Sequence, residues 1–116
     1  MRGKQHMTPE NAVIKECLEY LNLKGIFAWR NQTGALASSD GKRFIRFGKV
    51  GSADIIGILP GGRFIAVECK APNGRLSDYQ LAFLTDVEHM GGVAVIARSS
   101  EDIEKALKKA RAEAIA

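Results

Sequence analysis

The sequence predicts an α/β domain in which a mixed sheet is flanked by helices, and three observations support this fold class. Helix-start signatures stand at Thr8-Pro9, Ser77 and Ser99-Ser100. A strongly apolar hairpin occupies residues 54–70, and a short apolar strand covers residues 93–97. The expected order is therefore helix, strand, hairpin, helix, strand, helix, which is typical of a sheet with helices packed against it.

The first helix is predicted from its cap and from its apolar spacing. Thr8 is a suitable N-cap, and Pro9 fits the first helical position because it has no backbone N–H to satisfy. Gly25 ends the helix, and residues 26–30 form a short strand. The residues expected to face inward recur at helical spacing: Ile14, Cys17, Leu18 and Leu21.

Turn and capping signals divide the second half of the chain. Ser77 and Gln80 form a capping box at the start of the second helix. The other expected elements are the hairpin strands 54–59 and 63–70, the loop 71–74, the end of the second helix at Gly91-Gly92, the strand 93–97 and a last helix ending near Ala114.

Length and composition indicate one ordinary globular domain, which we place at residues 8–116, with residues 1–7 left out as a polar tail. Hydrophobic residues make up 46% and charged residues 26%, and no apolar run approaches the ~20 residues of a membrane span. Two cysteines with no zinc spacing indicate buried thiols in a reduced, cytoplasmic protein. The net charge of +4 permits a polyanionic partner without proving one.

Three charged residues in the apolar hairpin need a chemical explanation. Side chains alternate along a strand, so Glu68 and Lys70 share a face, and a turn centred on Gly61 places Asp54 opposite Glu68. Two close carboxylates repel each other, so the pair is costly unless a proton or a cation lies between them. Oxygen ligands of this kind suit Mg²⁺, and a nearby lysine can stabilise charge on a phosphate or help to deprotonate a water.

Each of these residues also has a purely structural interpretation. The hairpin charges are equally compatible with an ordinary ion pair at a solvated sheet end. Glu10 heads the inward stripe of the first helix, which suits a metal or substrate site, but an acid at a helix N-terminus is also favoured by the macrodipole. Gln80 either serves the capping box alone or directs its amide at the sheet.

These residues resemble a known nuclease family. Asp54, thirteen intervening residues and then Glu68-Cys69-Lys70 resemble the PD-(D/E)xK motif, and the element order resembles that superfamily's restriction-endonuclease-like αβββαβ core. With Gly51-Ser52-Ala53 upstream and the segment 76–80 (LSDYQ) downstream, nearly the whole chain from Thr8 resembles the virus-type replication-repair nuclease (VRR-NUC) domain in its stand-alone, phage-like form. Ala53 stands where the motif usually has proline, which shapes the backbone and does no chemistry.

The resemblance implies a Mg²⁺- or Mn²⁺-dependent, structure-specific DNA endonuclease of DNA repair that hydrolyses phosphodiester bonds in branched DNA such as Holliday junctions or flaps. It also implies a homodimer similar to Holliday junction resolvases, located in the host cytoplasm if a phage encodes it. Asp54 and Glu68 would bind metal with the backbone carbonyl of Cys69, and Glu10 would contribute directly or through water. Lys70 would be the catalytic lysine, and Gln80 would orient a ligand or the attacking water.

A basic segment between the first strand and the hairpin is expected to contact DNA. Residues 31–51 contain a ribbon that turns at Asp40-Gly41 and runs through residues 43–47, in which cations alternate with apolar residues. Such an arm gives sequence-independent contacts with phosphates, although a solvated ribbon is the alternative. The expected DNA-binding residues are Arg30, Asn31, Lys42, Arg43, Arg46, Lys49 and Arg75.

Two other function classes remain open from the sequence. The first is a non-catalytic module on a nuclease-like fold that holds DNA or a protein partner, and the second is a structural domain whose hairpin charges are simple ion pairs. The complete set of acids counts against the first, because a site without catalysis has no need for carboxylates that repel each other.

Overall fold

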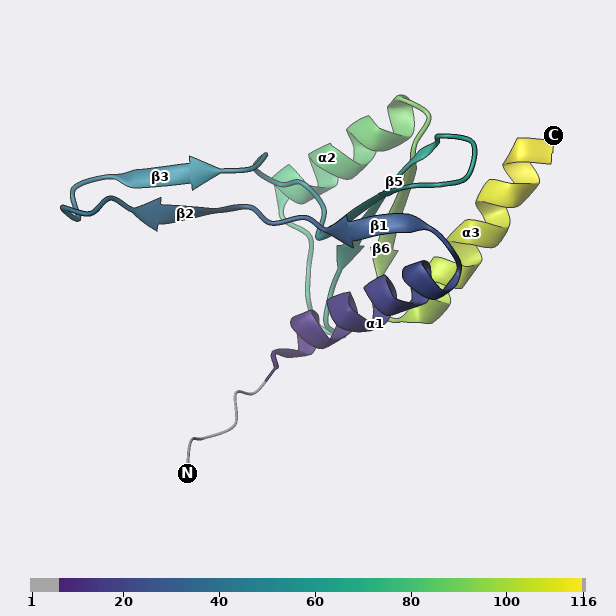
Figure 1. Ribbon diagram of the computed structural model, residues 1–116, viewed down its shortest axis with the longest axis horizontal. Coiled ribbons are helices and arrows are strands. Elements are labelled where there is room, and N and C mark those ends of the chain that lie inside the picture. The colour runs from purple at the N-terminus through teal and green to yellow at the C-terminus, as the bar shows by residue number, and fades with distance from the viewer. Residues whose placement is uncertain (1–6, 116) are drawn as a thin grey trace.

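The centre of the molecule is a four-stranded mixed sheet with the strand order β1-β4-β5-β6, seen in a computed structural model that describes residues 7–115 (Figure 1). Residues 1–6 of the predicted tail and Ala116 lie outside the described residues. Strands β1, β4 and β5 are antiparallel neighbours, and β6 runs parallel to β5. The elements are α1 (Pro9–Leu23), β1 (Phe27–Arg30), β2 (Gly34–Ala37), β3 (Phe44–Phe47), β4 (Ile55–Ile58), β5 (Phe64–Cys69), α2 (Asp78–His89), β6 (Val93–Ala97) and α3 (Ser100–Ile115).

Helices cover the two faces of the sheet unequally. On one face, α1 and α3 bury the larger core, which includes Cys17, Ile65 and Ile103. On the other face, α2 packs on β5 and β6 only, through a smaller cluster around Ala66 and Leu84. This arrangement confirms the predicted mixed α/β fold, which is consistent with a restriction-endonuclease-like core.

The helix boundaries follow the local signals in the sequence. Thr8 caps α1, because its hydroxyl oxygen accepts a hydrogen bond of 3.1 Å from the backbone N–H of Asn11. The predicted inward stripe of α1 is buried at Ile14, Cys17 and Leu21. Gly25 follows the helix with a φ of 75°, a left-handed conformation that favours glycine. Within the described part of the chain, no helix has both the length and the apolar character needed to cross a membrane.

The register of the β4–β5 hairpin is the one that the turn predicts. The backbone N–H of Leu59 donates to the carbonyl of Arg63 over 2.8 Å, and the pairing then runs outward from Ile58 opposite Phe64 to Ile55 opposite Val67. One more step places Asp54 opposite Glu68. The pairing therefore brings the two side chains to the same end of the sheet, where their carboxylates lie close together.

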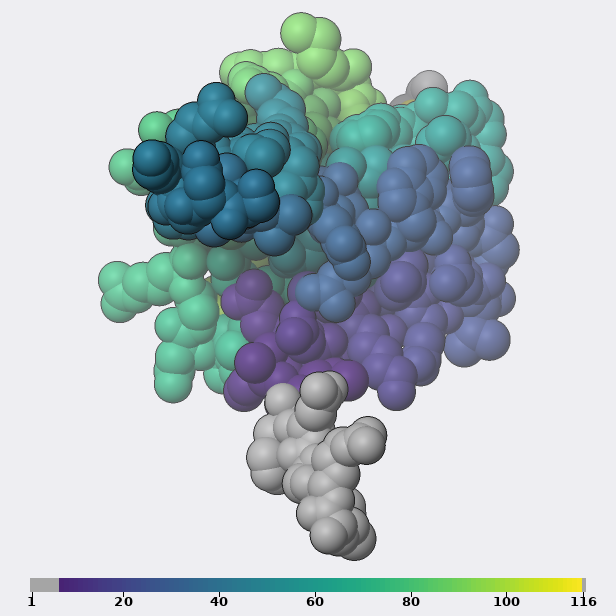
Figure 2. All heavy atoms as spheres, turned by 60° about the vertical axis from the view of Figure 1, so that its left-hand side comes forward, coloured from purple at the N-terminus to yellow at the C-terminus, as the bar shows by residue number. Residues whose placement is uncertain are grey.

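Strands β2 and β3 form a separate two-stranded ribbon that projects from the body, and we call residues 34–47 the arm (Figure 1). Its strands pair from Gly34 opposite Phe47 to Ala37 opposite Phe44, and the turn closes with the N–H of Ser38 donating to the carbonyl of Arg43. Figure 2 looks toward the arm, whose blue atoms stand in front of the body. The predicted ribbon is thus confirmed.

The chain returns from the arm to the sheet through a close contact at Gly51. Gly51 has a φ of 81°, and a Cβ added there would lie 2.5 Å from the carbonyl oxygen of Tyr79 in α2. We expect Gly51→Ala to lower the free energy of unfolding by about 2–4 kcal/mol, because left-handed strain adds to a backbone collision. Denaturant unfolding followed by circular dichroism measures this loss.

Gly25→Ala is the matched control for this substitution. Gly25 has a similar φ of 75°, but a Cβ added there would meet nothing within 4 Å. It should therefore cost only the backbone strain, about 1–2 kcal/mol. Equal losses for the two variants would show that the contact with Tyr79 is unimportant.

Candidate metal centre

Three carboxylates from distant parts of the chain meet at one end of the sheet. Glu10 comes from the first turn of α1, Asp54 immediately precedes β4, and Glu68 lies in β5. One oxygen of each lies within 4.8 Å of the others, and Glu68 is buried while Glu10 and Asp54 are half-buried. The fold therefore brings together all three acids that the sequence singled out.

Glu68 is the most constrained of the three. Its side chain is 1% exposed, and its Oε2 atom accepts no hydrogen bond from any described residue. The Lys70 ammonium lies 3.2 Å from that oxygen, in an ionic contact. Burial, and then the charge of Asp54, raise the pKa of Glu68 to about 7, although Lys70 acts in the opposite direction.

This arrangement suits a divalent cation better than a simple ion pair. The Lys70–Glu68 pair does form, but it is buried at 7% and 1% side-chain exposure, not at a solvated sheet end. One lysine faces three carboxylates, so the cluster keeps an excess of negative charge around a buried oxygen without a hydrogen bond. Hard cations such as Mg²⁺ and Mn²⁺ take carboxylate oxygens in this setting, so the residues present fit such an ion.

The backbone of β5 holds Asp54 in place. The N–H of Cys69 donates to the Oδ2 atom of Asp54 over 2.8 Å. In a β-strand the N–H and C=O of one residue point to the same side, so the carbonyl of Cys69 is also directed toward Asp54. This direction supports the expected use of that carbonyl as a ligand.

The thiol of Cys69 is not available to the cluster. It lies in the core between the sheet and α1, where Cys17 is its neighbour and both cysteines are free and buried, as predicted. The hydrogen bond with Cys17, followed by burial, raises the pKa of Cys69 above its usual value. The thiol therefore stays protonated, and metal ligation by this residue is left to its backbone.

Asn31 was predicted from the sequence only as a DNA contact, but in the structure it also holds the turn before β4 in place, as a brace. Its Nδ2 donates to the hydroxyl of Ser52 over 2.7 Å and to the carbonyl of Ala53 over 2.9 Å, and its backbone N–H donates to the carbonyl of Asp54. These bonds fix the turn that presents Asp54. Ala53, at the position where the family motif usually has proline, is buried against α2.

Gln80 makes the predicted capping box. Its Oε1 accepts from the backbone N–H of Ser77 over 2.9 Å, and the Ser77 hydroxyl accepts from the N–H of Gln80 over 3.1 Å. The amide oxygen is therefore occupied by the helix cap, while the amide nitrogen takes no part in it. An orienting role for Gln80 stays a prediction that depends on that nitrogen.

Arg98 fixes the loop that follows Lys70 and was not identified from the sequence. Its guanidinium donates to the carbonyls of Ala71, Pro72 and Gly74, and it extends from the end of β6 beside Lys70. Arg98 directly follows β6, and adjacent parallel strands end at the same edge of a sheet. This was the signal in the sequence that could have placed Arg98 beside Lys70. Arg75, one of the predicted DNA-binding residues, is exposed just beyond this loop.

Two of the other predicted DNA-binding residues, Arg30 and Asn31, line a polar cavity next to Asp54. The cavity has a volume of about 250 Å³ and is lined by Arg30, Asn31, Gln32, Thr33, Phe47 and Asp54. Arg30 donates to the side chain of Asn11 at the start of α1, over 3.0 Å. The arm begins at this cavity, and its predicted cations are exposed: Lys42, Arg43, Arg46 and Lys49.

The fold is a mixed sheet flanked by helices, and its hairpin carries two opposed acids with a lysine two residues after the second. This combination defines a nuclease of the PD-(D/E)xK class. Comparison with known families makes the assignment narrower. The sequence model of the VRR-NUC domain matches residues 7–101, and the chain therefore belongs to the VRR-NUC family. No curated protein sequence matches the chain.

The raised pKa of Glu68 makes metal binding dependent on pH. Below about pH 7 a proton occupies the carboxyl group and competes with a cation, whereas above that pH the carboxylate is free. We expect the Mn²⁺ affinity, measured by titration calorimetry, to fall about tenfold between pH 8 and pH 6. Equal affinities at the two pH values would contradict a cation bound by Glu68.

Proposed function

We propose that this nuclease is a structure-specific DNA endonuclease that uses Mg²⁺ or Mn²⁺ to hydrolyse phosphodiester bonds in branched DNA. The observation that carries the proposal is the convergence of Glu10, Asp54 and Glu68 within 4.8 Å, with Lys70 in contact with Glu68. Family membership supports the nuclease activity, and the exposed cations near the site support a nucleic-acid substrate.

Each residue has a distinct part in this proposal. Asp54, Glu68 and the carbonyl of Cys69 would hold the metal, and Glu10 would complete the site directly or through water. A divalent ion bound there would stabilise negative charge on the scissile phosphate and favour ionisation of a water. Lys70 is held by Glu68 on the same strand face, where its ammonium would donate to a phosphate oxygen or position the attacking water.

Branched DNA is the substrate that suits the surroundings of the site. Exposed cations occur on the arm, which begins beside Asp54, and at Arg75 beyond the loop that follows Lys70, where they would contact phosphates without reading bases. Asn31 would contribute through its free amide oxygen, because both donor contacts of its amide brace the turn before Asp54. The enzyme would then recognise the shape of the DNA, because only some DNA structures place their phosphates within reach of these cations.

Cleavage of synthetic DNA by matched variants tests the proposal. With Mg²⁺ or Mn²⁺, wild type should cut a four-way junction or a flap, and Asp54→Asn or Lys70→Ala should lower the single-turnover rate at least 100-fold. Glu10→Gln should weaken activity, whereas Glu19→Gln, an exposed acid on the same helix, should not. Inactive wild type with both metals, or fully active Asp54→Asn, would sink the catalytic assignment and favour a binding module.

A homodimer is part of the same proposal, and the uncovered part of the sheet supports it. Because α2 covers only β5 and β6, a row of apolar side chains across β1, β4 and the start of β5 stays exposed on that face. We call this row the open sheet face, formed by Phe27, Trp29, Ile58 and Phe64, which are 69%, 43%, 39% and 37% exposed. The rings of Phe27 and Trp29 lie 5.2 Å apart.

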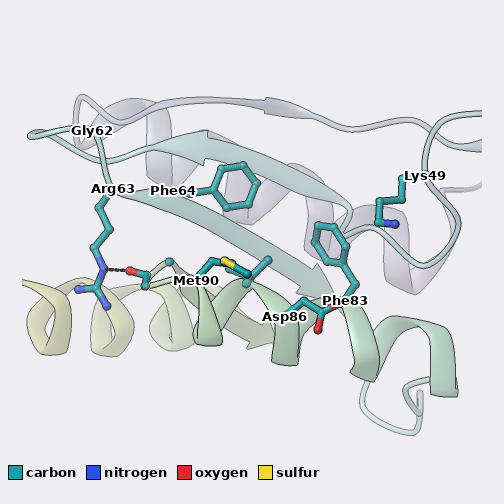
Figure 3. A pocket seen from close by; sticks show the side chains of 10 residues that line it. Lys49, Gly62, Arg63, Phe64, Phe83, Asp86 and Met90 are labelled. Atoms are coloured by element: carbon teal, nitrogen blue, oxygen red, sulfur yellow. Dashed lines mark hydrogen bonds between the residues drawn. The ribbon is translucent and has the colours of Figure 1, made fainter.

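The open sheet face continues into a cavity of about 450 Å³ beside α2, shown in Figure 3. Phe64 and Met90 line its apolar part, and the opposite charges of Lys49 and Asp86 lie along it. With Met90 the exposed apolar area is on the order of 500 Å², which is about what a standard interface of ~800 Å² per partner contains. The mixed charges allow reciprocal pairs across a two-fold axis.

Phe27→Glu should convert the dimer into a monomer, because it places a charge within the apolar area that the dimer would bury. Light scattering coupled to size-exclusion chromatography measures the mass. Leu23→Glu is the matched control, since Leu23 is 85% exposed at the end of α1 on the opposite side of the sheet. An unchanged mass for Phe27→Glu, or a monomeric wild type, would remove the dimer from the proposal.

A further inference from the structure

The arm exposes apolar side chains on both of its faces. Pairing of Leu36 with Ile45 puts these two residues on one face, and pairing of Ala37 with Phe44 puts Phe44 on the other. Phe44 is 78% exposed, Leu36 63% and Ile45 58%. A two-stranded ribbon has no core of its own, so these side chains stay exposed to solvent, whereas large apolar side chains are normally buried.

We propose that the arm binds unpaired bases of the DNA substrate, with one base stacked on Phe44 and others packed against Leu36 and Ile45. This inference deepens the proposed function and rests on it, because it names the feature of branched DNA that the enzyme recognises. The arm then selects DNA that contains unstacked bases over an intact duplex. Aromatic side chains stack on bases of any sequence, so the selection is by structure.

The charge of the arm favours a nucleic acid as its occupant. Lys42, Arg43 and Arg46 are exposed beside the apolar residues, and the acid near them, Asp40, lies at the tip. Hydrogen bonds from the Ser38 hydroxyl and from the N–H of Lys42 lower the pKa of Asp40 and engage its carboxylate within the turn. Cations interleaved with apolar side chains match single-stranded DNA, which offers phosphates and base faces together.

Exposure on both faces favours unpaired bases over other surfaces. A flat protein partner covers one face of a ribbon and would leave Phe44 or the Leu36–Ile45 pair in water. An intact duplex stacks its bases, so their apolar faces are not accessible to either side of the arm. Strands that separate at a branch point can instead pass along both faces.

The root of the arm connects this binding to the metal centre. The ring of Phe47 lies across Gly34, where an added Cβ would come within 2.9 Å of it, so the two strands are closely packed at the root. Phe47 and Asp54 line the same cavity of about 250 Å³. A four-residue strand spans about 13 Å, which corresponds to roughly four nucleotides of stacked DNA, so cleavage is expected within a few nucleotides of the branch.

Fluorescence anisotropy of labelled DNA in metal-free buffer with EDTA tests the proposal without cleavage. The probes are a flap, a four-way junction and an intact duplex of equal length. Phe44→Ala should weaken binding to the flap and the junction about tenfold and binding to the duplex less than twofold. Phe44→Tyr should restore the affinity, because the aromatic ring remains.

Two controls separate stacking from other effects. Leu23→Ala removes an equally exposed apolar residue outside the arm and should leave all three affinities unchanged. Arg46→Ala should weaken binding to all three probes alike and reduce the salt dependence of binding by about one charge, whereas Phe44→Ala should leave the salt dependence unchanged.

Three results would overturn the inference. The first is an equal effect of Phe44→Ala on duplex and branched DNA, and the second is no effect on any of them. The third is a loss of dimer mass in Phe44→Ala without DNA, which would assign the arm to a second copy of the chain. Arm-dependent selectivity in a protein that cuts no DNA would instead reject the proposed catalysis and leave this inference standing.

Discussion

The register of the β4–β5 hairpin is the constraint on which the chemistry of this protein depends. The apolar residues of both strands are buried only in one register, and the turn beginning at Leu59 selects it. In that register Asp54 faces Glu68, and Lys70 follows on the same face. A slip by one residue would bury charges in the main core and expose its aliphatic side chains. The same pairing therefore determines both the burial of the core side chains and the approach of the carboxylates.

The sheet carries rows of apolar side chains near the hairpin turn and a row of charged side chains at its other end. The rows near the hairpin turn are apolar, and they pack on α2 or form the open sheet face. The row at the other end is charged and meets the first turn of α1, while the arm begins beside it. The open sheet face and the carboxylate cluster thus lie at separate places on the same sheet.

The sequence predicted those features that depend on local patterns. Caps at Thr8 and Ser77, the hairpin register and the approach of Glu10 follow from short-range spacing and helical periodicity. The brace at Asn31 could not be predicted, because its bonds join residues 21 and 22 positions apart and leave no periodic trace in the sequence. The place of Arg98 after β6 could have indicated that it lies beside Lys70, but the carbonyls that it contacts could not be predicted. The predicted capping box at Gln80 is confirmed, and the predicted orienting role would have to use the amide nitrogen, which takes no part in the cap.

The raised pKa of Glu68 has a consequence for the folding of the chain without a bound cation. A proton on this carboxyl relieves the repulsion from Asp54, so the chain can reach its native structure without a cation to neutralise the cluster. A proton and a metal cation would then compete for the same buried carboxylate of Glu68. A cation that binds this carboxylate would displace the proton, so its binding would release a proton to the solvent.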